Sequence, residues 1–365
     1  MNPVQEAKRL GQSIWLDYIR RDLITSGELK KLVESGLSGM TSNPTIFQKA
    51  IAQSDEYNEA LRAILKSSPD ADIKTIYERL AVEDIQMVAD ILRPVYDETG
   101  GLDGFVSLEC SPHLAYDTDN TIVEARHLWQ LVNRPNVLIK VPSTPRGIPA
   151  IEKLISEGVN INVTLMFSLK HYEAVSHAYI RGIARNPHPS SVASVASFFV
   201  SRVDTYVDRE LEKMGTGEAL ALRGKAAIAN SKLVYRRFRE VFFGEEFAAE
   251  HKRGAHVQRV LWGSTSTKNP AYSDVMYVEG LIGPDTVNTV PLETLEAFRD
   301  HGQVWRTVDK GVKEAEERLG RLKRGGIDLD AITEQLQKDG VKAFADSFDQ
   351  LLGALEEKRK AWAAY

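Results

Sequence analysis

The chain has 365 residues, of which 43% are hydrophobic and 27% are charged, and its formal net charge is −5. These values are typical of one large or two medium globular domains, and they give no reason to expect binding to nucleic acid or to an anionic membrane. The eight histidines lack the spacing of a metal site, and a single cysteine, Cys110, excludes an intrachain disulfide. Because the chain also shows no secretory signal and no membrane-spanning apolar run, we expect a cytoplasmic protein.

Short apolar runs alternate with longer segments of helical periodicity up to about residue 300. The expected strands are Ser13–Ile19, Gly39–Asn43, Gly104–Cys110, Asn136–Val141, Asn160–Met166, Val192–Val200, Arg259–Gly263 and Val287–Pro291. Their continuous apolar character is typical of parallel strands that are covered by helices. Eight such strands alternating with helices predict an α/β fold of the closed (β/α)8-barrel type.

Several local signals place the helices of this barrel. Thr25-Ser26-Gly27-Glu28 has the pattern of a capping box, and Asp72 precedes a run with the spacing of a buried helical stripe. Residues 54–97 hold two helical patterns where a barrel needs one. Residues 302–365 are helical in pattern throughout, with a break at Gly325-Gly326. We therefore expect a catalytic barrel domain over residues 1–301 and carboxyl-terminal helices, residues 302–365, packed on it.

Lys140 is the most informative residue, because it lies in the apolar run Val137-Leu138-Ile139-Lys140-Val141-Pro142. A charged amine on a buried strand must be paired or must lose its proton, and a neutral amine is a nucleophile toward carbonyl carbons. The alternative is a lysine at a strand end whose amine reaches solvent.

Polar residues at the ends of other expected strands favour the catalytic interpretation over a structural ion network. In a (β/α)8 barrel the chemistry lies at the carboxyl ends of the strands, where Asp17, Glu109 and Lys140 would converge. An imine-forming lysine needs a proton relay to expel water and a base for the hydroxyl beside the bond that breaks. Glu109 with Thr164 can provide the relay through one water, and Asp17 can be the base. The remaining polar residues, expected to hold substrate hydroxyls, are Asn43 and Asn162.

Two loops in the second half combine hydroxyl groups with positive charge. Ser197 and Arg202 belong to the first, and Ser266 and Lys268 to the second. Hydroxyls, a guanidinium and an ammonium near helix amino termini suit a phosphate ester, although Ser/Thr loops often only cap helices. Trp15 is expected either at the barrel bottom or in the sugar pocket, and the sequence leaves both open.

These stretches resemble the transaldolases, which are imine-forming enzymes of the pentose phosphate pathway. The matching segments are Trp15-Leu16-Asp17, Thr41-Ser42-Asn43-Pro44, Val106-Ser107-Leu108-Glu109, Leu114-Ala115-Tyr116-Asp117, Val137-Leu138-Ile139-Lys140-Val141-Pro142, Asn162-Val163-Thr164-Leu165-Met166-Phe167-Ser168 and Ser197-Phe198-Phe199-Val200-Ser201-Arg202. The length and the segment 285–291 look like the longer bacterial members. The chain departs from the pattern at Lys268, where many members have arginine, so that the bidentate fork is lost.

The resemblance implies Lys140 as the imine lysine, Asp17 as the base for carbon–carbon cleavage, and Glu109 and Thr164 as partners of the catalytic water. It also implies sugar orientation by Asn43 and Asn162, and phosphate binding by Ser197, Arg202 and Ser266. The predicted reaction transfers dihydroxyacetone from fructose 6-phosphate or sedoheptulose 7-phosphate to glyceraldehyde 3-phosphate or erythrose 4-phosphate. No cofactor or metal is expected, and the protein is expected to be a monomer or a homodimer.

The sequence leaves two alternatives open. One is an aldolase on the same scaffold that releases free dihydroxyacetone instead of passing it to an acceptor. The other is a catalytically silent barrel that binds sugar phosphates as a sensor or scaffold.

Overall fold

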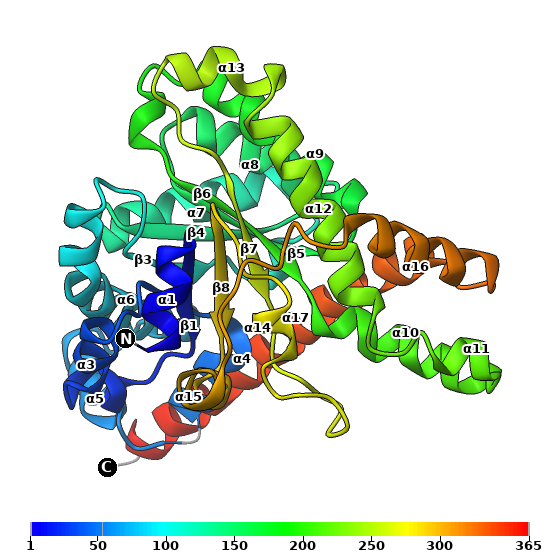
Figure 1. Cartoon of the computed structure of the whole chain (residues 1–365). Coiled ribbons are helices and arrows are strands. Elements are labelled where there is room, and N and C mark those ends of the chain that lie inside the picture. Colours follow the sequence, from blue (N-terminus) through cyan, green and yellow to red (C-terminus); the bar gives the residue numbers. More distant parts are fainter. Residues whose placement is uncertain (1, 53, 364–365) are drawn as a thin grey trace.

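A computed structural model describes residues 2–52 and 54–363 of the chain, and its centre is a closed barrel of eight parallel strands (Figure 1). Each strand pairs with the next one in the sequence, and β8 closes the barrel on β1. The strands are β1 Gln12–Asp17, β2 Gly39–Thr41, β3 Phe105–Glu109, β4 Val137–Pro142, β5 Ile161–Met166, β6 Ser194–Phe199, β7 Arg259–Gly263 and β8 Thr286–Val290. The predicted (β/α)8 barrel and all eight predicted strands are confirmed.

Helices surround the barrel and also pack at its two ends (Figure 1). They are α1 Pro3–Arg9, α2 Arg21–Thr25, α3 Glu28–Glu34, α4 Pro44–Phe47, η1 Gln48–Ala52, α5 Asn58–Ser67, α6 Ile73–Glu98, η2 Pro112–Leu114, α7 Thr118–Val132, α8 Gly147–Ser156, α9 Leu169–Arg185, η3 Pro189–Ser191, α10 Ser201–Met214, α11 Gly217–Leu220, α12 Ala226–Phe242, α13 Glu245–Lys252, α14 Met276–Glu279, α15 Leu292–His301, α16 Val312–Arg324 and α17 Leu329–Ala363. The two helices expected within residues 54–97 are α5 and α6, and the Asp72 side chain caps α6 as predicted.

Two local predictions were wrong. The predicted capping box at residues 25–28 does not form: Thr25 ends α2 and donates its hydroxyl to the Arg21 carbonyl. Gly27, the residue directly before α3, has the left-handed conformation, at φ +82°, and α3 has no side-chain cap. Strand β2 ends at Thr41 rather than at Asn43, because Asn43 accepts a hydrogen bond from the Ile46 amide and thereby caps α4.

The lower part of the barrel interior is a packed apolar core that supports the mouth above it. Trp15 belongs to this core, where it is fully buried and donates from Nε1 to Asp103 Oδ1 at 2.8 Å. A Cβ on Gly39 would lie 2.4 Å from the indole ring, so only glycine allows β2 to pass this close. Trp15 therefore packs at the bottom of the barrel and does not line the sugar pocket.

The carboxyl-terminal helix α17 runs across the end of the barrel where the strands finish (Figure 1). It contacts α4, η1, α10 and β5, and it buries Val341, Phe344, Phe348, Leu351 and Leu355. The break at residues 325–326 is confirmed, since α16 ends at Arg324 and Gly326 has φ +89°.

The expectation of helix throughout residues 302–365 was wrong at its beginning, because residues 302–311 form no helix. Their Thr307 and Val308 amides instead donate to the Ile282 carbonyl ahead of β8. Residues 364–365 lie outside the described part, and the domain boundary at residue 301 stays a prediction. Among the helices of residues 2–52 and 54–363, none is long and apolar enough to cross a membrane.

Candidate active site

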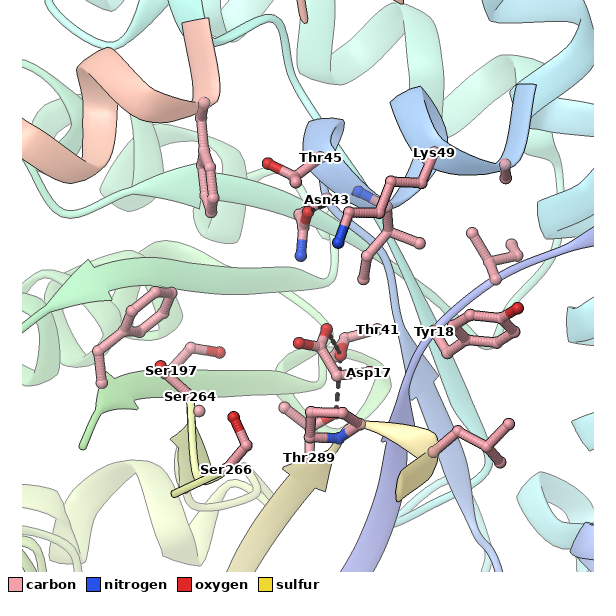
Figure 2. Close-up of a pocket in the computed structure, with 18 of the residues that line it drawn as sticks. Asp17, Tyr18, Thr41, Asn43, Thr45, Lys49, Ser197, Ser264, Ser266 and Thr289 are labelled. Carbon is pink, nitrogen blue, oxygen red and sulfur yellow. Dashed lines mark hydrogen bonds between the residues drawn. The ribbon is translucent and has the colours of Figure 1, made fainter. Parts of the chain in front are cut away.

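A pocket of about 640 Å³ opens at the carboxyl-terminal end of the barrel (Figure 2). The ends of β1, β2, β4, β6, β7 and β8 form its wall, together with α4, η1 and one residue of α17, Phe344. Lys140 and Asp17 both belong to this wall. The convergence expected for a barrel mouth is therefore present for these two residues.

Lys140 is buried on β4, with 4% of the residue exposed. Its Nζ donates to the Ser42 carbonyl oxygen at 3.0 Å and lies 3.2 Å from Glu109 Oε2. The Phe344 ring of α17 covers the same amine at 5.8 Å from ring centroid to Nζ. The amine is thus held by one carbonyl and one carboxylate beneath an aromatic ring, and it does not extend to bulk solvent.

Asp17 is oriented by a short chain of hydroxyl groups (Figure 2). Thr41 Oγ1 donates to Asp17 Oδ1 at 2.7 Å, and Thr289 Oγ1 lies 2.7 Å from the Thr41 hydroxyl. Burial raises the pKa of Asp17, while the positive charge of Lys140 and the Thr41 hydrogen bond oppose that rise. A carboxylate with a raised pKa is a better proton acceptor than an exposed one, which suits a catalytic base.

Glu109 and Thr164 do not line the large pocket, although both lie on strands beside Lys140. The register pairs Glu109 with Lys140 and Pro142 with Thr164 on neighbouring strands. Burial raises the pKa of Glu109, and the Lys140 charge opposes the rise. Thr164 Oγ1 is buried without a hydrogen-bond partner among the described residues, and Glu109 Oε2 is buried with the Lys140 amine as its ion-pair partner. Each oxygen has lone pairs left that can bind a water molecule.

The two predicted sugar-orienting amides occupy different positions. Asn43 lines the pocket and points into it, with its side-chain oxygen already used to cap α4. Asn162 lies deeper, where it donates to Ser107 Oγ at 2.9 Å and accepts from Ser197 Oγ at 2.6 Å. These two bonds fix the orientation of the Asn162 amide. Because the Ser197 hydroxyl donates its proton to Asn162, its oxygen at the pocket wall can only accept a further hydrogen bond.

All four residues predicted to bind phosphate line the pocket: Ser197, Arg202, Ser266 and Lys268. Lys268 Nζ donates to Ser266 Oγ at 2.7 Å. Arg202 lies in the first turn of α10 with its guanidinium 5.1 Å from the Phe199 ring, and burial lowers its pKa against the opposing charge of Asp17. In Figure 2 Ser197, Ser264 and Ser266 lie on one side of the pocket, while Asn43 and Lys49 lie on the other side.

The sequence interpretation missed several residues of the wall. Thr41 and Thr289 could have been identified, because each occupies an inward-facing position near the end of its strand. Lys49 carries no comparable signal, since it lies on the short π-helix η1 rather than on a strand. Phe344 lies in the carboxyl-terminal helices that were expected only to pack on the barrel, and nothing local indicates that it covers Lys140. Within the described ranges, no cluster of three or more His, Cys, Asp or Glu residues could hold a metal ion.

The fold and this pocket together define a (β/α)8-barrel enzyme with a buried lysine in its mouth. Residues 14–355 match the family model described as transaldolase/fructose-6-phosphate aldolase. A transaldolase of Thiobacillus denitrificans is 48% identical over 360 residues, covering 97% of this chain and all of the relative. A transaldolase of Frankia alni is 46% identical, covering 98% and 97% of the two chains, and one of Mycolicibacterium smegmatis is 43% identical, covering 95% and 94%. The chain belongs to the transaldolase/fructose-6-phosphate aldolase family.

Proposed function

We propose that this protein transfers a dihydroxyacetone unit between sugar phosphates through an imine on Lys140, in the non-oxidative pentose phosphate pathway. The observation that carries the proposal is the position of the Lys140 amine, 3.2 Å from the Glu109 carboxylate and in the same pocket wall as Asp17. Donors would be sedoheptulose 7-phosphate or fructose 6-phosphate. Acceptors would be glyceraldehyde 3-phosphate or erythrose 4-phosphate.

The reaction begins when the Lys140 amine attacks the C2 carbonyl carbon of the ketose phosphate. The carbinolamine loses water, and Glu109 passes the required proton through a water molecule held between its Oε2 and the Thr164 hydroxyl. The raised pKa of Glu109 supports this role, because a carboxyl group that titrates at higher pH can both give and take a proton.

Cleavage follows when Asp17 takes the proton of the C4 hydroxyl group. The C3–C4 bond breaks, its electron pair moves into the iminium system on Lys140, and the aldose phosphate leaves. The bound three-carbon unit then attacks the aldehyde carbon of an acceptor, and Asp17 returns its proton to the new hydroxyl group. Water finally hydrolyses the imine and frees the Lys140 amine.

The remaining residues would bind and orient the substrate. Asn43 and Asn162 would hold sugar hydroxyl groups, the latter together with Ser197 through the hydrogen bond between them. Arg202, Ser266 and Lys268 would bind the phosphate group. Lysine in place of arginine at position 268 supplies charge without a bidentate fork, so Ser266 and Arg202 would provide the directional contacts.

A second candidate is an aldolase that releases free dihydroxyacetone, because the family description covers both activities. The position of α17 favours transfer, since Phe344 covers the Lys140 amine and limits the access of water to the intermediate. Free dihydroxyacetone measured with fructose 6-phosphate and no acceptor separates the two: a transferase releases one equivalent or less per enzyme, and an aldolase releases it continuously.

The test of the mechanism is borohydride reduction in the presence of fructose 6-phosphate, followed by mass spectrometry of peptides. A reduced three-carbon adduct on Lys140 is expected, and none in the Lys140→Met variant. An active Lys140→Met variant, or an adduct on another lysine, would exclude the proposal.

We further propose a cytoplasmic enzyme that binds no nucleic acid and is a monomer or a homodimer. Its single cysteine, Cys110, is a buried free thiol, which suits a reducing compartment. Size-exclusion chromatography with light scattering tests the assembly state.

A further inference from the structure

The basic side of the pocket is assembled from two segments that are far apart in the sequence. Arg202 lies in the first turn of α10. Ser266 and Lys268 belong to the β7–α14 loop, residues 264–275, which has no regular secondary structure. A phosphate group that contacts both segments needs their separation to be fixed before it binds, because an unfixed loop must be ordered at the cost of binding free energy.

One side chain of the loop reaches back to the helix that carries Arg202. Tyr272 donates its hydroxyl to Asp208 Oδ2 at 2.7 Å, and Asp208 lies on α10 with only 7% of the residue exposed. The second carboxylate oxygen of Asp208 accepts from the Gly224 amide at 2.9 Å. The bond from Gly224 therefore fixes the Asp208 carboxylate, whose other oxygen accepts from Tyr272.

The structure also provides a fitted position for the Tyr272 ring. Gly224 has φ +66°, and a Cβ on it would lie 2.8 Å from Tyr272 Cζ. The ring therefore packs directly on the glycine backbone, although the neighbouring Ala271 and Ser273 are exposed. Such close packing of one half-buried side chain, between two exposed ones, indicates a specific attachment of the loop.

The loop has a second connection to α10, at its beginning. The Ser201 amide, at the start of α10, donates to the Ser264 carbonyl at 2.9 Å, and the hydroxyl oxygens of the two residues lie 3.1 Å apart. Thr265 donates to Asn288 of β8. Thr267 donates to the Ser273 carbonyl at 2.7 Å, which closes the loop on itself. Asp274 pairs with His301 of α15, and both of those side chains are largely exposed.

We propose that Tyr272 is a positioning residue for substrate phosphate, fixing the loop that carries Ser266 and Lys268 relative to the helix that carries Arg202. The inference rests on the phosphate site proposed above. Only four positions separate Lys268 from Tyr272. Asp208 follows Arg202 by six positions, less than two helical turns. The Tyr272–Asp208 hydrogen bond therefore fixes the loop after Lys268, and the Ser264–Ser201 bonds fix it before Ser266.

The test compares a phosphorylated with an unphosphorylated acceptor in the Tyr272→Phe variant, which loses only the hydroxyl. The measured quantity is kcat/KM for glyceraldehyde 3-phosphate and for D-glyceraldehyde, with fructose 6-phosphate as donor. In a double-displacement reaction this quantity does not depend on the donor concentration. We expect a decrease of roughly 5-fold for the phosphate ester, the effect of one lost hydrogen bond, and no change for D-glyceraldehyde.

Tyr277→Phe is the matched control. The Tyr277 hydroxyl donates to Asp204, which like Asp208 lies on α10, at 3.0 Å. Tyr277 itself lies in α14, outside the loop. This variant is expected to be less stable to urea while keeping the wild-type ratio of the two kcat/KM values. Asp208→Ala should lower the ratio as Tyr272→Phe does, and the double variant should lower it no further.

Three results would overturn the inference: an unchanged ratio in Tyr272→Phe, an equal loss for both acceptors, or an equal change of the ratio in Tyr277→Phe. The wild-type kcat/KM values show whether the Tyr272 inference alone is wrong or whether the proposed phosphate site is wrong. If wild-type kcat/KM shows no preference for the phosphorylated acceptor, the phosphate site is wrong and the role of Tyr272 is wrong with it.

Discussion

Replacing Lys140 by methionine removes one partner of a buried ion pair and nearly keeps the volume of the side chain. The Lys140 and Glu109 side chains are each 5% exposed, and Nζ lies 3.2 Å from Oε2. Removing one member of such a pair costs roughly 3–5 kcal/mol when the other charge stays buried and unpaired. The folded protein can reduce this cost by protonating Glu109, which makes the effect dependent on pH.

The direction of the pH dependence follows from the pKa of Glu109. Burial already raises this pKa above its ordinary value of 4.5, and the Lys140 charge opposes the rise. Without that charge the pKa rises further, so the folded variant holds a proton that the unfolded chain releases. The stability contributed by that proton is complete below pH 4.5 and is lost as the pH rises through the folded-state pKa.

We therefore expect Lys140→Met to lose about 1 kcal/mol of unfolding free energy at pH 5 and about 3 kcal/mol at pH 8, since each pH unit accounts for up to about 1.4 kcal/mol. Urea denaturation of the wild type, Lys140→Met, Glu109→Gln and the double variant at both pH values measures this. The double variant lacks both charges and should lie within about 1 kcal/mol of the wild type at either pH. An equal loss at pH 5 and pH 8 in Lys140→Met would refute the ion-pair reasoning.

Three further predictions concern the base, the covering helix and the barrel core. Asp17→Asn should lower turnover by roughly 10²- to 10⁴-fold, while borohydride still labels Lys140; loss of labelling would mean that Asp17 acts before cleavage. Phe344→Leu should raise the release of free dihydroxyacetone measured without acceptor, and Phe348→Leu, which is equally buried on α17 but outside the pocket wall, should not. Gly39→Ala should lower the unfolding free energy by about 1–3 kcal/mol through overpacking against Trp15, whereas Gly353→Ala, whose Cβ would meet no atom within 4 Å, should not destabilise the protein.

The sequence by itself determined the barrel and the residues that point into its mouth. Apolar runs spaced by helices predict parallel strands, and the alternation of side chains along a strand places Asp17, Lys140 and Asn162 on the inward face. These are local rules, because each depends on a few neighbouring residues. The same rules would have found Thr41 and Thr289, which orient Asp17.

The tertiary structure decided the depth of each group and the elements that cover the mouth. Asp17 and Lys140 line the pocket whereas Glu109 and Thr164 do not, and this difference depends on how neighbouring strands and helices pack around each side chain. Phe344 covers Lys140 although some 200 residues separate them, and Tyr272 is bonded to Asp208, which precedes it by 64 residues. Contacts of this kind arise from the packing of whole elements, and no periodicity within either segment encodes them.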